Sequence, residues 1–114
     1  MIKIAHVREM TLISELPVQV IKAIKDVVTI LDDEYGEFRD VDKDYGGYAL
    51  VLESEDELEL LEHLASGTII FEYVDQILCE DGRVFVSALT LLGSDFGIVL
   101  IMPFEMFNKK YENN

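Results

Sequence analysis

Residues 83–102 read RVFVSALTLLGSDFGIVLIM and decide the fold. Their two runs of β-branched, leucine and aromatic residues flank Gly93-Ser94, a pair that suits a type II′ hairpin turn. A similar run begins at Thr68, and Asp81-Gly82 separates it from the others as a two-residue hairpin loop. The sequence therefore predicts three antiparallel strands, at 68–78, 83–92 and 96–102.

Parts of these strands are too apolar to leave one face of the sheet in water. Val84–Val86 and Ile98–Ile101 contain no polar residue, so helices, loops or a second subunit must cover both faces. Two earlier segments are expected to add strands, Gly47–Glu53 and, at an edge of the sheet, Ile2–Val7.

A first helix is predicted between Pro17 and Asp33, where apolar residues recur every three or four positions. Proline suits the first turn of a helix, and the glycine of Tyr35-Gly36 can adopt the left-handed conformation that ends one. The inward stripe consists of Ile21, Ile24, Val28 and Leu31, widened by Val20, Val27 and Ile30.

A second helix is predicted to begin at Ser54, because Ser54-Glu55-Asp56-Glu57 matches a capping box. In that motif the serine hydroxyl accepts from the amide of Glu57, whose side chain returns to the serine amide. Leu58, Leu61 and Leu64 or Ala65 form the inward stripe, and Ser66-Gly67 closes the helix. We therefore expect a single domain over residues 1–114 with an α+β fold, in which two helices pack on a mainly antiparallel sheet of three to five strands.

Negative charge is concentrated in the middle of the chain. Residues 32–62 hold 13 of the 23 acidic residues and two basic ones, so they carry 11 of the 14 excess negative charges. A need for solubility alone would not favour so uneven a distribution, although it remains the simplest alternative. A concentrated acidic surface suits a basic partner, because complementary charge accelerates association.

Composition excludes several other classes. Nine basic residues, with no cluster larger than Lys109-Lys110, cannot neutralise a nucleic-acid backbone, so direct nucleic-acid binding is not expected. No apolar run approaches the length that spans a bilayer, and the first residues lack the features of a secretory signal. Cys79 is the single cysteine, which fits a reducing compartment. We therefore expect a cytoplasmic protein without membrane contact.

Metal and catalytic motifs are weak. Asp40, Asp42 and Asp44 have the alternate spacing of calcium ligands, but Tyr45 and Val51 occupy the positions where an EF-hand loop needs glycine and glutamate. The remaining candidates for nucleophilic or acid-base chemistry are His6, His63 and Cys79, and none has a local partner that would activate it. No cofactor and no metal site is expected.

Three segments carry a resemblance to a known group of proteins: DEYG (33–36), GGYALV (46–51) and GSDFGIVL (93–100). With these, the chain resembles small acidic proteins of bacterial prophages and other mobile elements. Some proteins of that kind are anti-CRISPR or antirestriction inhibitors that present carboxylates in place of phosphates. The resemblance implies such a nucleic-acid mimic and assigns no role to an individual residue.

The function predicted from these observations is non-catalytic binding and inhibition of a basic, nucleic-acid-handling protein. The alternatives are an immunity protein that neutralises a basic toxin nuclease and a small metal-dependent enzyme. A homodimer is also expected if one sheet face stays open and exposes Phe85, Leu89, Phe96 or Ile98. The residues expected to bind the partner are Asp32, Asp33, Glu34, Glu37, Asp40, Asp42, Asp44, Glu55, Glu59 and Glu62.

Overall fold

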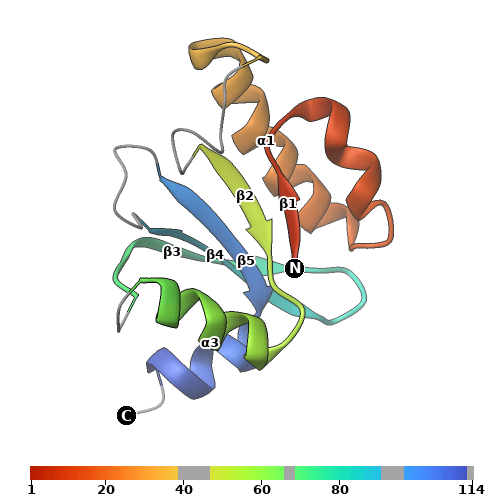
Figure 1. Cartoon of the computed structure of the whole chain (residues 1–114). Helices are drawn as coiled ribbons and strands as arrows, with labels where there is room; N and C mark the ends of the chain where they lie inside the picture. The colour runs from red at the N-terminus through yellow and green to blue at the C-terminus, as the bar shows by residue number, and fades with distance from the viewer. Residues whose placement is uncertain (39–46, 66–68, 91–96, 113–114) are drawn as a thin grey trace.

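The computed structural model describes residues 1–38, 47–65, 69–90 and 97–112. Five strands form one sheet in the order β1-β2-β5-β4-β3 (Figure 1). Strands β2 and β5 run parallel, and the other three neighbouring pairs are antiparallel. The strands are β1 (Ile2–Ile4), β2 (Tyr48–Val51), β3 (Phe71–Leu78), β4 (Val84–Thr90) and β5 (Ile98–Pro103).

The fold is α+β, as expected, but a mainly antiparallel sheet with two helices fits it only roughly. The chain leaves β2, passes through a helix and the β3–β4 hairpin, and returns beside β2, so β2 and β5 meet in parallel. The described helical segments are the 3₁₀ helix η1 (Val7–Ile13), α1 (Val18–Tyr35), α3 (Glu55–Leu64), α4 (Phe104–Phe107) and the π-helical η2 (Asn108–Glu112).

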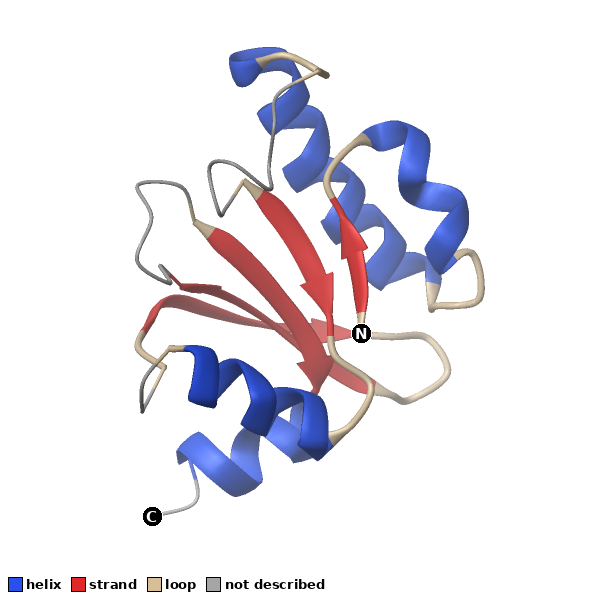
Figure 2. Ribbon diagram, viewed as in Figure 1, coloured by secondary structure: helices blue, strands red, loops and turns tan. Residues whose placement is uncertain are grey.

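Helices cover both faces of the sheet (Figure 2). Alternate residues of the central strands therefore enter different cores. Val51 and Ile101 pack with η1 and α1, whereas Leu50 and Leu100 pack with α3 and α4. This explains why strands β2 and β5 lack the alternation of apolar and polar residues that a half-exposed sheet shows. Among the described helices, none combines the length and the apolarity that crossing a bilayer requires.

The expected open sheet face is not present at two of its predicted positions. Phe85 is buried in the α1 core, and Ile98 is buried in the α3 core. Leu89 is half-buried, and Phe96 lies outside the described residues. The open face on which the expected homodimer depended is therefore not present at Phe85 and Ile98, because Phe85 packs in the α1 core and Ile98 in the α3 core.

The β3–β4 hairpin lies where Asp81-Gly82 predicted it, but its loop differs. The Cys79 amide donates to the Arg83 carbonyl at 3.0 Å, so the loop has three residues and Gly82, with φ of 88°, completes it. The Asp81 carboxylate accepts two hydrogen bonds from Arg83, one from its backbone amide at 2.9 Å and one from its side-chain Nε at 2.7 Å. These hydrogen bonds lower the pKa of Asp81. The turn expected at Gly93-Ser94 lies outside the described residues.

Helix α3 begins at the predicted cap. Ser54 Oγ accepts from the Glu57 amide at 3.4 Å, as the motif requires. The return contact differs from the prediction, because Glu57 Oε1 accepts from the Glu53 amide at 2.7 Å instead of the serine amide. The Glu57 carboxylate therefore binds the amide of the residue before the N-cap and fixes the chain where it enters the helix. The predicted end at Ser66-Gly67 lies outside the described residues.

We expect Ser54→Ala to lower the free energy of unfolding by about 0.5 to 1 kcal/mol, because it leaves the Glu57 amide without its side-chain acceptor. Denaturant titration followed by circular dichroism measures this change. Ser54→Asp is the matched control and should retain wild-type stability, since aspartate caps helices as well as serine does. Equal loss in both variants would show that the cap is not the source of the effect.

Candidate functional site: the acidic end of helix α1

Helix α1 is fixed to the sheet along one side. Val20, Ile24 and Val28 are spaced four residues apart and have no exposed surface, as their helical spacing predicted. Ile30 was expected to widen this buried stripe, but 56% of it is exposed. Two residues correspond to about 200° around a helix, so Ile30 points away from the face on which Val28 is buried.

The helix ends at Gly36, as predicted. The Gly36 amide donates to the Asp32 carbonyl at 3.0 Å, and the glycine has a φ of 88°. The last turn holds Asp32, Asp33 and Glu34 and no basic residue. Carboxylates at this end face the negative pole of the helix dipole, which makes their placement unfavourable for stability.

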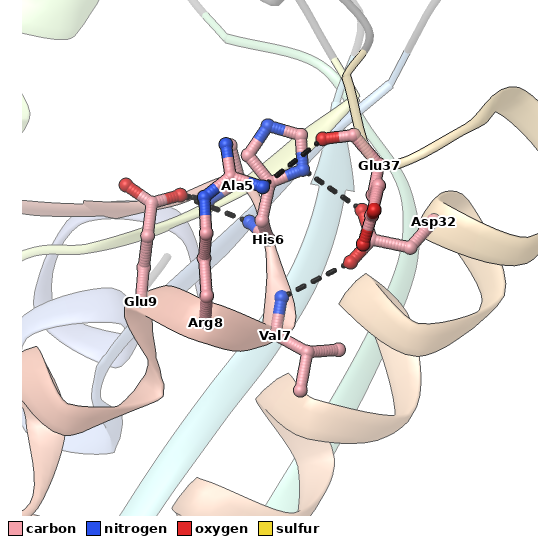
Figure 3. Close-up of polar contacts among 7 residues, drawn as sticks. All are labelled: Ala5, His6, Val7, Arg8, Glu9, Asp32 and Glu37. Carbon is pink, nitrogen blue, oxygen red and sulfur yellow. Dashed lines mark hydrogen bonds and ion pairs between the residues drawn. The ribbon is translucent and has the colours of Figure 1, made fainter.

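Asp32 has a structural role that explains its position (Figure 3). Its Oδ1 lies 2.9 Å from His6 Nδ1, and its Oδ2 accepts from the Val7 amide at 3.1 Å. His6 is buried, and 14% of the Asp32 side chain is exposed. Asp32 therefore joins the start of η1 to the end of α1, and little of its carboxylate remains for a partner.

Neighbouring contacts reinforce this junction (Figure 3). Glu9 Oε1 accepts from the amides of Ala5 and His6, each at 2.9 Å, and so caps the first turn of η1. Arg8 Nη1 donates to the Glu37 carbonyl at 3.2 Å, which ties η1 to the residue that follows the end of α1. The junction gives the acidic end of the helix a defined position on the fold.

Beyond the junction, acidic and aromatic side chains are exposed together. Asp33, Glu34 and Glu37 are all exposed, and 85% of Phe38 is accessible. Tyr35 is also exposed between them. We call these five residues the α1 tip. Aromatic residues are enriched in the centres of protein interfaces, and carboxylates favour a basic counterpart.

The sheet separates the α1 tip from the acidic residues of α3. Helix α3 packs on the opposite face, so Glu55, Glu59 and Glu62 do not share a surface with the end of α1. Part of this second group is neutralised within the chain. Lys109 Nζ lies 3.1 Å from Glu55 Oε1, and Lys110 pairs with Glu62.

The Lys110–Glu62 pair also affects titration. The hydrogen bond that Lys110 donates to the Glu62 carboxylate is the main cause that raises the pKa of Lys110. Burial, together with the nearby Glu62, raises the pKa of Tyr111. Of the predicted partner-binding residues, Asp40, Asp42 and Asp44 lie outside the described residues. The described residues thus divide the predicted acidic surface between two sites, of which the α1 tip is the less neutralised.

The candidates for chemistry are scattered in the structure. His6 is buried at the α1 junction, His63 is exposed on α3, and Cys79 is half-buried at the end of β3. Desolvation is the main cause that raises the pKa of the Cys79 thiol, which disfavours the reactive thiolate. Within the described ranges, no three His, Cys, Asp or Glu residues are grouped as metal ligands.

No protein-family model matches the chain, and neither a curated protein sequence nor a solved structure matches it significantly. Sequence reasoning selected the acids of the α1 tip but missed its aromatic residues. The available signal was Phe38 itself, a large apolar side chain that follows the helix end at Gly36 within an acidic segment.

Proposed function

We propose that this protein is a non-catalytic binding protein that docks its α1 tip on a basic surface of a nucleic-acid-handling protein and so inhibits it. The observation that carries the proposal is Phe38, which is 85% exposed and directly follows the exposed carboxylates of Asp33, Glu34 and Glu37 in the sequence. An apolar ring in water contributes nothing to folding stability, whereas the same ring buried in an interface contributes strongly to affinity.

The acidic residues support the same proposal from energetics. Asp33 and Glu34 lie at the negative end of α1, where each carboxylate is unfavourable for the helix. Asp32 occupies the same turn, but its contacts with His6 and Val7 compensate for its position. Folding stability gives no reason for carboxylates at Asp33 and Glu34, whereas attraction to a basic partner does.

The class of partner follows from charge. Proteins that handle nucleic acids carry clustered Lys and Arg that neutralise phosphates, and carboxylates can occupy such a surface in their place. Carboxylates bound to that basic surface would exclude the nucleic acid and so inhibit the partner. The acidic charge of the whole chain, −14, would also accelerate the encounter.

A comparative pull-down tests the proposal. The wild-type chain, a variant with Asp33→Asn, Glu34→Gln and Glu37→Gln, and a Phe38→Ala variant serve as baits in host lysate at low and high salt. We expect a nucleic-acid-handling protein to be retained by the wild type at low salt and to be reduced in both variants. The matched control changes three other exposed carboxylates by the same charge, with Glu15→Gln, Asp26→Asn and Glu53→Gln. Equal capture by the triple variant and its control would contradict a role for the α1 tip.

The same substitutions predict an opposite effect on stability. Asp33→Asn and Glu34→Gln together should raise the free energy of unfolding, by about 0.3 to 1 kcal/mol for each carboxylate removed from the negative end of α1. Thermal unfolding at low ionic strength measures the gain, and added salt should reduce it. Binding that falls while stability rises would distinguish a functional surface from a damaged fold. A loss of stability would refute the energetic argument.

A further inference from the structure

Strand β3 forms an edge of the sheet that is long and largely exposed. Within the described part of the chain it pairs only with β4. Tyr73 and Leu78 are each 69% exposed, and Val74 is exposed as well. Natural proteins usually shorten, charge or cover such an edge, because its free main-chain groups can pair with another strand.

The direction of those main-chain groups follows from the hairpin. The Cys79 amide donates to the Arg83 carbonyl, so this pair is hydrogen-bonded. Hydrogen-bonded and non-hydrogen-bonded pairs alternate along an antiparallel ladder. The register from Tyr73 to Leu78 is continuous with that pair, so the N–H and C=O groups of Val74, Gln76 and Leu78 point away from the sheet.

The charges along this edge are acidic. Glu72 and Asp75 are exposed on β3, Glu80 is exposed in the hairpin loop, and the strand contains no lysine, arginine or proline. The adjacent Arg83 is bound by Asp81 at 2.7 Å. The edge therefore combines main-chain donors and acceptors, apolar side chains and unbalanced negative charge.

A second copy of the chain fits this edge poorly. In an antiparallel pair, residues directly opposite each other point to the same face of the sheet. Two identical β3 strands related by two-fold symmetry must therefore pair about one residue, which lies opposite its own copy. Centring on Asp75 places that carboxylate against its copy. Centring on Gln76 or Ile77 confines the strand pairing to residues 74–78 or 76–78, because the hairpin turn begins directly after Leu78. Centring on Val74 brings the irregularity near the start of β3 into the pair. Like charges directly opposite are destabilising.

We propose that β3 accepts an extended segment of a partner protein as a sixth strand of the sheet. That segment would place apolar side chains beside Val74 and Leu78 and a lysine or arginine beside Asp75. Its main chain would bond to Val74, Gln76 and Leu78, which gives affinity, while the alternating side chains give specificity. This surface is distinct from the α1 tip and does not depend on the function proposed for it.

The test uses a capped synthetic peptide, about as long as β3, that alternates lysine with valine. A second peptide of the same sequence carries N-methyl groups on alternate residues, so it keeps the charge but cannot complete the ladder. Calorimetry at physiological salt should show binding of the first peptide and at least about tenfold weaker binding of the second, since several main-chain hydrogen bonds are lost.

Two variants locate the site. Gln76→Pro removes one outward N–H and leaves the bonds to β4 in place, because proline is tolerated where a strand N–H faces solvent. Asp75→Lys reverses the charge without altering the main chain. Both variants should bind the first peptide with at least about tenfold lower affinity than the wild type. The Asp33, Glu34 and Glu37 triple variant should bind it with wild-type affinity. Circular dichroism checks that each variant is folded.

Three outcomes would overturn the proposal. If the first peptide does not bind, β3 is not a strand-accepting edge. If the N-methylated peptide binds with equal affinity, the interaction is charge attraction and not main-chain pairing. A dimer of the free chain in sedimentation experiments, abolished by Gln76→Pro, would assign the edge to a second copy instead. None of these outcomes bears on docking by the α1 tip, which the triple variant tests separately.

Discussion

Leu61→Ala should lower the free energy of unfolding by about 2 to 5 kcal/mol. Leu61 is 5% exposed and belongs to the core between α3 and the sheet. Truncation removes buried apolar surface and leaves a cavity in a layer that α3 closes. Small domains are stable by about 5 to 15 kcal/mol, so this single change could remove a large part of the total.

The neighbouring residue provides a matched control. Leu60 lies on the same helix, and 48% of it is exposed, so Leu60→Ala should change stability by no more than about 0.5 kcal/mol. Both variants carry the same chemical change and the same helix propensity. Denaturant unfolding of the pair, followed by circular dichroism, measures the difference. Equal effects would mean that α3 does not pack on the sheet through Leu61.

The features that sequence predicted correctly are local. The start of α3 at Ser54 and the end of α1 at Gly36 depend on residues within one turn of the chain. The buried stripe of α1 likewise follows from helical spacing alone. Such features appear in sequence because their energetic causes lie within a few residues of each other.

The parallel pairing of β2 with β5 could not be predicted in the same way. It brings Tyr48 beside Ile98, and both strands are apolar enough to occupy any central position in a sheet. Which strand lies next to β2 depends on how both faces are covered, and that is a property of the whole fold. Whether a sheet face would stay open at Phe85 could not be predicted for the same reason, because the residues of α1 that pack with Phe85 come from a distant part of the sequence.

The site shows the same limit. Acidic residues that are continuous in sequence between Asp32 and Glu62 appear as one surface, but the sheet lies between the end of α1 and α3. Sequence also gave Asp32 the same role as Asp33, since both are aspartates in one helical turn. Their roles differ because His6, 26 residues earlier, lies beside only one of them.

This difference yields a strong prediction. Asp32→Ala should lower the free energy of unfolding by about 1 to 3 kcal/mol, because it removes the carboxylate that lies against the buried His6 ring and leaves the Val7 amide without its side-chain acceptor. Asp33→Ala is the matched control one residue later in the same turn. It should leave stability unchanged or slightly higher, since it removes an exposed carboxylate from the negative end of α1.

A double-mutant cycle assigns the loss to the His6–Asp32 contact. If the two side chains stabilise the fold through each other, His6→Ala and Asp32→Ala combined should cost less than the sum of the single changes, by at least about 0.5 kcal/mol. Additive losses would mean that each residue acts through other neighbours. Coupling would establish that the first residues of the chain hold the end of α1 in place. The exposed carboxylates and Phe38 would then extend from a fixed base, and association would not have to order that base as well.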